Sequence, residues 1–258
     1  MRIIYEPKKR MGQVFLANRA IAELEAKYAK GKNVIEIGSG YGILTAELCR
    51  YANRVVSVEK DENLYALLKG ELRERNLTLL NKDFFEASDG ELGLGYADML
   101  VANIPYELSS KTIDWLCVHR LEAILCVQNE FAERMLAKEG TKKYSKLSVV
   151  SRLMFNIEKV AEVNRKNFRP IPRVDSCVIH MKPNGTVLSE AEMKMIGFMM
   201  QHKRRTVRSA FASMHAQAGL PKSRLRLVAE SLGNGSARVF TLSPAEILAT
   251  ARLALERI

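Results

Sequence analysis

Apolar residues gather in short runs over the first half of the chain, and these runs alternate with helix-like segments. Runs of strand type occupy residues 33–37, 54–58, 77–81, 97–102 and 123–127, whereas residues 43–51 have the spacing of a helix. Short strands that alternate with helices are typical of a parallel sheet with right-handed crossovers. The pattern therefore predicts an α/β fold, to which residues 147–163 and 176–181 are expected to add an antiparallel pair.

The pattern changes after the turn residues Lys182-Pro183-Asn184-Gly185. Helix-start residues follow near Ser189, Leu220 and Ser243, and no strand-like run interrupts them. We therefore expect a basic N-terminal arm at residues 1–16, an α/β domain at residues 17–183 and a small all-helical domain at residues 186–258.

Composition narrows the class of protein. The chain has 258 residues, 47% of them hydrophobic, which is enough for one sizeable core and a smaller appendage. No signal core follows Met1 and no span of about twenty apolar residues occurs, so we expect a cytoplasmic protein without a membrane anchor. The cysteines (Cys49, Cys117, Cys126 and Cys177) lack metal-ligand spacing and are expected to be buried thiols, without a structural metal or disulfide.

The net charge of +11 is concentrated in four clusters of basic residues. Such clusters attract polyphosphate and make binding dependent on salt, so structured RNA is the expected partner. We also expect Arg204 and Arg208 to share one face of a helix, because they are four positions apart. The candidate RNA-binding residues are Lys8, Lys9, Arg10, Lys142, Lys143, Lys146, Arg169, Arg173, Lys203, Arg204, Arg205 and Arg208.

A glycine-rich loop follows the first predicted strand. Gly38-Ser39-Gly40-Tyr41-Gly42 lies between strand and helix, where glycines allow a ligand to approach the backbone. Glu59 ends the next strand about twenty residues later, where a carboxylate can accept hydrogen bonds from ribose hydroxyls. These features indicate a nucleoside cofactor. A nicotinamide or flavin dehydrogenase is the alternative, although Ile43 stands where that fold expects its third glycine.

Two further strand ends carry candidate chemistry. Asp83 and Phe84 follow the third strand, where an adenine would lie, and Asn103-Ile104-Pro105-Tyr106 ends the fourth. Pro105 forces the preceding residue into an extended conformation, so the Ile104 carbonyl would project into the site. That carbonyl and the Asn103 amide oxygen can hold both hydrogens of an adenine N6 amine, while Tyr106 stacks on the base for roughly 1–3 kcal/mol.

The chain resembles the KsgA-type family of ribosomal RNA adenine N6,N6-dimethyltransferases. The resemblance runs from Lys9 to about Phe211, and its specific segments include residues 9–16, 36–40, 58–61, 103–106, 144–149, 168–176 and 202–208. It implies a Rossmann-like class I methyltransferase sheet and S-adenosylmethionine as cofactor. It also implies dimethylation of two adjacent adenosines in a stem-loop near the 3′ end of small-subunit rRNA. The implied partners are this rRNA and pre-30S-type particles, and we expect a monomer.

The resemblance also assigns roles to individual positions. Glu59 would take the cofactor's ribose hydroxyls and Asp83 its adenine amino group, while Tyr106 and Phe168 would clamp the flipped target base. The family commonly has Asn where this chain has Val14, so a contact there would use the backbone or be absent. The expected catalytic residues are Asn103, Ile104, Pro105, Tyr106 and Phe168, and the expected cofactor-binding residues are Gln13, Val14, Leu16, Gly38, Gly40, Glu59, Lys60, Asp83, Phe84 and Asn103.

Other functions stay open. A related enzyme acting on large-subunit rRNA would share most of these motifs. An assembly factor whose binding matters more than its catalysis would share them all. Methyltransferases of protein glutamine or DNA adenine are less favoured, since those commonly carry a second proline where Ile104 stands.

Overall fold

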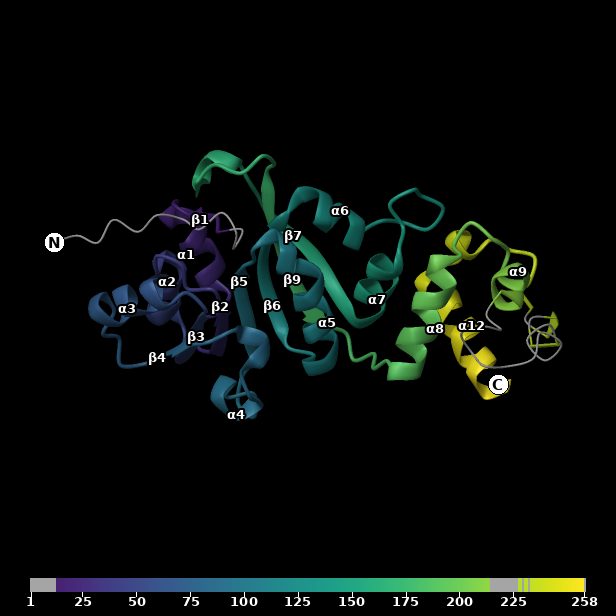
Figure 1. The fold of residues 1–258 in the computed structure, drawn as a ribbon, viewed down its shortest axis with the longest axis horizontal. Coiled ribbons are helices and arrows are strands. Elements are labelled where there is room, and N and C mark those ends of the chain that lie inside the picture. The colour runs from purple at the N-terminus through teal and green to yellow at the C-terminus, as the bar shows by residue number, and fades with distance from the viewer. Residues whose placement is uncertain (1–12, 214–226, 229, 232, 258) are drawn as a thin grey trace. The chain divides into compact units, whose positions relative to one another are not determined.

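The structure is a computed structural model that describes residues 13–213, 227–228, 230–231 and 233–257 (Figure 1). It divides into two compact units, one built from residues 1–132 and 157–182 and the other from residues 133–156 and 183–258. The second unit thus takes in a segment that precedes the predicted domain boundary at residues 183–186. The predicted N-terminal cluster Lys8, Lys9 and Arg10 and the predicted helix start at Leu220 lie outside the described residues.

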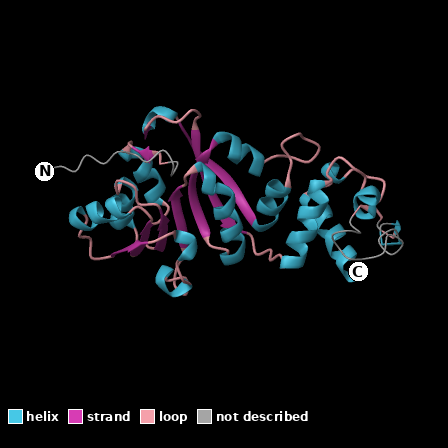
Figure 2. Ribbon diagram, viewed as in Figure 1, coloured by secondary structure: helices cyan, strands magenta, loops and turns pink. Residues whose placement is uncertain are grey.

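A seven-stranded sheet forms the centre of the first unit (Figure 2). Its strand order is β4-β3-β2-β5-β6-β9-β7, in which β2 to β6 are parallel and β9 is antiparallel to β6. The strands are β2 (Asn33–Ile37), β3 (Arg54–Glu59), β4 (Leu77–Asn81), β5 (Met99–Asn103), β6 (Glu122–Gln128), β7 (Phe155–Val163) and β9 (Ser176–Pro183). The predicted α/β class and its five parallel strands are confirmed.

Helix α1 (Arg19–Lys27) precedes the first parallel strand, β2. The other helices follow the parallel strands in turn, because each crossover must return the chain to the same end of the sheet. They are α2 (Ile43–Tyr51), α3 (Glu62–Glu71), α4 (Asp89–Leu92), α5 (Ser109–His119) and α6 (Asn129–Met135). Short 3₁₀ helices are η2 (Phe84–Glu86), η3 (Tyr106–Leu108) and η4 (Arg165–Asn167). A separate two-stranded sheet pairs β1 (Phe15–Leu16) with β8 (Phe168–Arg169).

One hydrophobic core lies between the central sheet and helices α1 and α2. Side chains alternate between the two faces of a strand, so Val34, Val101, Ile124 and Val178 all point into this layer. Ala22 of α1 and neighbouring small residues allow the helix to approach the sheet closely, and they are fully buried. This packed core fixes the positions of the residues at the carboxyl ends of β2, β3 and β5.

The predicted edge strand at residues 147–163 is wrong over its first half. Residues 146–154 form helix α7 (Lys146–Met154), and β7 begins only at Phe155. Ser145 and Ser148 form a reciprocal cap at the start of α7, while Val149, Val150, Leu153 and Met154 lie buried. A helical spacing of apolar residues with a cap therefore overrides the β-branched composition of this segment.

The second unit is helical among the residues that the structure describes. Its helices are α7, α8 (Glu190–Gln201), α9 (Val207–Ala212), α12 (Pro244–Arg257) and the 3₁₀ helix η5 (Val239–Thr241). Ser189 lies at a predicted helix start and forms a capping box of α8 with Glu192, which also accepts from Arg252 Nε at 2.5 Å. The buried Tyr144 hydroxyl donates to the Leu242 carbonyl at 2.9 Å and ties the start of α7 to η5.

The predicted helix face shared by Arg204 and Arg208 is wrong. Helix α8 ends at Gln201, residues 202–205 form turns, and α9 begins at Val207 with Thr206 as its N-cap. The Thr206 side chain accepts from Ser209 N, which makes a new helix start where continuation was expected. Arg204 therefore lies in the turn and Arg208 in the first turn of α9.

Candidate active site

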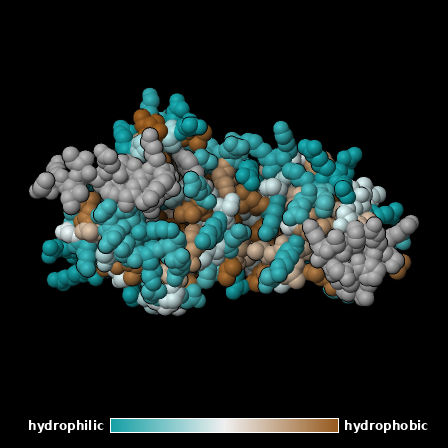
Figure 3. All heavy atoms as spheres, in the orientation of Figure 1, coloured by the Kyte–Doolittle hydropathy of each residue, from teal (hydrophilic) through white to brown (hydrophobic). Residues whose placement is uncertain are grey.

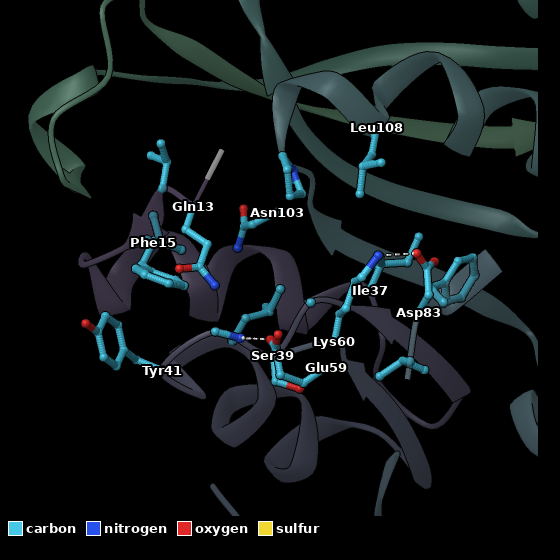
Figure 4. Close-up of a pocket in the computed structure, with 18 of the residues that line it drawn as sticks. Gln13, Phe15, Ile37, Ser39, Tyr41, Glu59, Lys60, Asp83, Asn103 and Leu108 are labelled. Atoms are coloured by element: carbon cyan, nitrogen blue, oxygen red, sulfur yellow. Dashed lines mark hydrogen bonds and ion pairs between the residues drawn. The ribbon is translucent and has the colours of Figure 1, made fainter. Parts of the chain in front are cut away.

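A cavity of about 320 Å³ opens at the carboxyl ends of the parallel strands in the first unit (Figure 4). This volume is within the roughly 300–1,000 Å³ typical of small-molecule sites. The strand order reverses between β2 and β5, which is where open α/β sheets bind their ligands. Predicted cofactor residues that line the cavity are Gln13, Val14, Leu16, Gly38, Gly40, Glu59, Lys60, Asp83, Phe84 and Asn103.

The glycine loop after β2 borders this cavity and tolerates no side chain at Gly40. The residue has a φ of +56°, and a Cβ there would lie 2.8 Å from Phe15 Cδ1. The Phe15 ring in turn packs edge-on against Tyr41, with ring centroids 4.5 Å apart. Two aromatic rings and a bare backbone therefore form one wall of the cavity, on the left in Figure 4.

Glu59 forms the opposite wall from Asn103 in the same view. Its carboxylate accepts hydrogen bonds from the backbone of Gly40 at 2.9 Å and of Asp61 at 2.8 Å. Burial raises the pKa of Glu59, and these two backbone donors oppose the rise. Each carboxylate oxygen retains a further lone pair, so Glu59 is fixed in place and can still accept from a ligand.

Asp83 closes the far side of the cavity at the start of η2. Its Oδ1 accepts from Phe85 N at 3.0 Å and its Oδ2 pairs with Lys60 Nζ at 2.8 Å. Burial alone would raise the pKa of Asp83, but the hydrogen bonds from Lys60 and Phe85 hold it below its usual value. The buried Phe84 ring lies beside this carboxylate and packs against Trp115, with centroids 5.0 Å apart. A charged acceptor next to a flat apolar surface suits a purine.

Asn103 is the last residue of β5, and its carboxamide borders the cavity. Its Oδ1 is buried and has no hydrogen-bond partner among the described residues. The backbone continues through Ile104, whose N–H donates to the Cys126 carbonyl at 3.3 Å, and through Pro105 to η3. Tyr106 begins η3, but its side chain lies outside the described part of the structure. The turn after β5 thus presents an unsatisfied acceptor at the rim of the cavity.

Phe168 reaches this rim through the pairing of β8 with β1. Leu16 is opposite Phe168 in that pairing, and a small second cavity joins Phe168 to Val14, Asn103, Ile104 and Pro105. The Phe168 side chain is only 4% exposed. It therefore lies beside the predicted catalytic residues as a packed ring, and its role against a flipped base stays a prediction.

The interpretation of the sequence missed two buried carboxyl groups behind the cavity. Glu36 of β2 is fully buried and accepts from Thr45 Oγ1 at 2.7 Å and from Ser57 Oγ at 2.5 Å. Burial raises the pKa of Glu36 to about 7, and the two hydroxyl donors limit that rise. Glu25 of α1 is also fully buried, and burial raises its pKa well above the usual value. The sequence signal that could have revealed Glu25 is a glutamate among the apolar positions of α1.

Basic residues of the first unit surround the cis peptide bond between Arg169 and Pro170. Arg169 and Arg173 are exposed, and the same loop exposes the apolar residues Ile171 (56%) and Val174 (44%). Positive charge next to exposed apolar surface fits contact with the phosphates and bases of a folded RNA. The RNA-binding role of Arg169 and Arg173 stays a prediction.

Basic residues of the second unit differ in how far the fold itself engages them. Lys142, Lys143, Lys146, Arg204, Arg205 and Arg208 are exposed. Of these, Lys143 forms an ion pair with Glu133 and Arg205 donates to Ser213 Oγ. Lys203 instead donates to the carbonyls of Lys142 at 3.0 Å and Tyr144 at 2.5 Å, and burial lowers its pKa. Hydrophilic residues cover most of the face of each unit seen in Figure 3. Lys203 thus helps to hold the loop that presents the other lysines.

None of the helices in the described part of the chain has the length and apolar character needed to cross a membrane. Within that part, no group of three or more His, Cys, Asp or Glu residues is arranged to hold a metal ion. Cys117, Cys126 and Cys177 are buried and Cys49 is partly buried, and none of these four cysteines forms a disulfide.

Comparisons with known proteins identify the relatives of this chain. Residues 5–237 match the family model described as ribosomal RNA adenine dimethylase. The probable ribosomal RNA small subunit methyltransferase A of Thermococcus gammatolerans is 35% identical over 255 residues, covering 95% of this chain and 90% of that protein. The corresponding protein of Thermotoga neapolitana, named ribosomal RNA small subunit methyltransferase A, is 36% identical over 208 residues, with 78% of each chain covered.

Two solved structures share the fold over nearly the whole chain. A dimethyladenosine transferase from Plasmodium falciparum has a TM-score of 0.80 at 27% identity, covering 94% of this chain and 98% of its own. The 23S rRNA methyltransferase ErmE has a TM-score of 0.62 at 25% identity, covering 93% of this chain and 99% of its own.

Proposed function

The chain belongs to the ribosomal RNA adenine dimethylase family and is an rRNA adenine dimethyltransferase; on that premise, we propose that it dimethylates N6 of two adjacent adenosines near the 3′ end of small-subunit rRNA. The family uses S-adenosylmethionine, and we place that cofactor in the cavity at the carboxyl edge of the sheet. The observation that carries the proposal is the convergence of Glu59, Asp83 and Asn103 on this one cavity.

The residues fit that cofactor. Glu59 has lone pairs left for the ribose hydroxyls, Asp83 is a charged acceptor for the adenine amine, and the glycine loop lines the cavity with bare backbone at Gly38 and Gly40. When bound, the cofactor supplies an electrophilic methyl group on its sulfonium. The protein's part is mainly to position the target amine for an in-line attack.

The orphaned Asn103 Oδ1 and the Ile104 carbonyl are the acceptors proposed for that amine. Holding both of its hydrogens draws the nitrogen lone pair out of conjugation with the ring. No general base is needed, because the newly methylated amine is a strong acid and releases its proton to water. Tyr106 and Phe168 are proposed to stack on the flipped base, which offsets part of the few kcal/mol that flipping costs.

Methylation of large-subunit rRNA is the second candidate, and the likeness to ErmE favours it. The likeness to the dimethyladenosine transferase is stronger, with a TM-score of 0.80 against 0.62. The curated relatives described above also carry small-subunit names. We therefore propose small-subunit rRNA, within pre-30S-type particles, as the substrate.

Product mapping tests the proposal. Small and large ribosomal subunits that lack the modification are incubated together with the protein and labelled methyl donor, and the rRNA of each subunit is analysed by mass spectrometry. We expect dimethyladenosine at two neighbouring positions near the 3′ end of the small-subunit rRNA. Label confined to large-subunit rRNA would show that the substrate assignment is wrong.

Variants of two asparagines test the site itself. Asn103→Ala should abolish transfer and change the cofactor Kd only slightly, because it removes an acceptor for the target amine. Asn53→Ala is the matched control, since Asn53 donates to the Gly31 carbonyl just before β3, away from the carboxyl edge. Transfer by Asn103→Ala at the wild-type rate would remove Asn103 from the mechanism.

A further inference from the structure

Helix α1 carries a buried carboxyl group, that of Glu25, which the packing of the fold does not explain. Ala22, Glu25 and Ala26 lie at helical spacing on its buried side, Ala29 follows just after the helix, and each is fully buried. Neither Glu25 oxygen has a hydrogen-bond partner among the described residues. A buried polar group without a partner costs about 1–3 kcal/mol, so its presence calls for a functional explanation.

Strand alternation turns the Asn103 side chain toward the core layer that contains the buried side of α1. Met99, Val101 and Asn103 alternate along β5, so the Asn103 side chain points toward the layer occupied by α1 and α2. Cys126 lies opposite Asn103 on β6 and belongs to the same core layer. Burial raises the pKa of Cys126, and Glu25 adds to that rise, while the Asn103 side chain opposes the raised pKa of Glu25 itself.

The contact between the two side chains is incomplete as they stand. The Asn103 carboxamide is the group that most opposes the raised pKa of Glu25, yet the pair falls short of normal hydrogen-bond geometry. Asn103 Oδ1 is likewise buried without a partner. Catalytic hydrogen bonds are often long or misaligned without substrate and tighten when it binds.

We propose that Glu25 is a positioning residue that holds the amide nitrogen of Asn103 and thereby presents the amide oxygen to the target amine. A carboxamide has a donor end and an acceptor end, and a half-turn exchanges them. Only the acceptor end can take a hydrogen from the amine. The carbonyl oxygen of the Glu25 carboxyl is an acceptor whether or not the group is protonated, and it selects the productive orientation by accepting from Nδ2. The inference rests on the proposed function and deepens it.

Three variants separate this role from a structural one. Glu25→Met removes both oxygens at similar volume, and Glu25→Gln keeps one oxygen as an acceptor. Glu47→Met is the matched control, because Glu47 is a buried glutamate of α2 that pairs with Arg19 at 2.5 Å and Arg50 at 2.7 Å and does not line the cavity. Single-turnover methyl transfer, cofactor Kd and Tm are measured for each variant.

The two roles predict opposite patterns. Glu25→Met should lower the transfer rate by about 10- to 100-fold, the cost of a misplaced reacting group. Kd should be maintained and Tm should not fall, because the substitution removes an unpartnered buried carboxyl group. Glu25→Gln should restore the rate to within about threefold of wild type. Glu47→Met should lower Tm and leave the rate of the folded protein unchanged. Wild-type transfer by Glu25→Met, or an equal loss in Glu25→Gln, would overturn the inference.

A spectroscopic measurement decides the matter even if the substrate assignment fails. The Asn103 side-chain NH₂ signals, assigned by their loss in Asn103→Ala, are followed by nitrogen–proton correlation spectroscopy of the intact protein. We expect these protons to exchange slowly with water in the wild type and in Glu25→Gln, and faster in Glu25→Met. Identical exchange in all three proteins would contradict a bond to Glu25. Absence of methyl transfer by the wild type would instead count against the proposed function.

Discussion

Stability should fall as pH rises through the titration of Glu36, and Glu36→Gln should remove this dependence. Glu36 is fully buried, its Oε2 accepts from Thr45 and Ser57, and its Oε1 has no partner among the described residues. Ionisation would therefore place a charge in the core with only two hydroxyl donors. The pKa of about 7 against an ordinary 4.5 expresses that cost.

The magnitude follows from linkage between protonation and folding. Below pH 4.5 the carboxyl is protonated in both states and the folded protein has its full stability. Between pH 4.5 and 7 the unfolded chain releases the proton and the folded chain keeps it, so stability decreases. One pH unit is worth about 1.36 kcal/mol, and the interval from 4.5 to 7 therefore amounts to about 3 kcal/mol.

Denaturant unfolding of wild type and Glu36→Gln between pH 4.5 and pH 8.5 provides the measurement. Gln retains one oxygen to accept from Thr45 and Ser57 but cannot ionise, so its unfolding free energy should lack this decline. The difference between the two proteins should grow by about 3 kcal/mol across the range. Subtraction also removes much of the contribution of other buried carboxyls, such as Glu59. Parallel curves for the two proteins would refute the reasoning.

Two other variants test the cavity and the RNA surface. Glu59→Gln should weaken cofactor binding by about 10- to 100-fold in calorimetric titration, because a hydrogen bond to a charged group is worth about 1.5–3 kcal/mol; an unchanged Kd would remove Glu59 from the cofactor site. Arg173→Ala should reduce the slope of log binding constant against log salt for the substrate RNA by about 1, as expected for one lost phosphate contact. The exposed Glu158→Ala serves as its control, and equal slopes for wild type and Arg173→Ala would exclude that contact.

Much of the fold could be predicted from the sequence because its strands are short, apolar and separated by capped helices. The boundaries of β4 and α2 agree with the predicted ranges 77–81 and 43–51. Residues 146–154 were misassigned because Val149 and Val150 are typical of strands, whereas the Ser145 cap and a partner surface for Leu153 are what make this segment a helix. Local composition thus failed where packing decided the outcome.

The cavity was predictable to the extent that topology determines it. The carboxyl ends of parallel strands meet at one edge, so Glu59, Asp83 and Asn103 had to converge once their strands were recognised. The engagement of individual side chains did not follow from the pattern. Lys203 was counted among the RNA-binding residues, yet its ammonium group donates to two carbonyls of its own unit. A run of basic residues does not reveal which member the fold itself uses.

Glu25 is a second case in which the sequence pattern does not reveal the partner of a side chain. Its position among Ala22, Ala26 and Ala29 interrupts an apolar stripe, and an interrupted stripe can be recognised from sequence. What the stripe cannot indicate is the partner, because that depends on which side chain of β5 faces α1. Strand alternation supplies this information only after the register of Met99, Val101 and Asn103 is known. A charged residue at a predicted core position therefore suggests a functional partner at a nearby strand end. In this chain the proposed partner is Asn103.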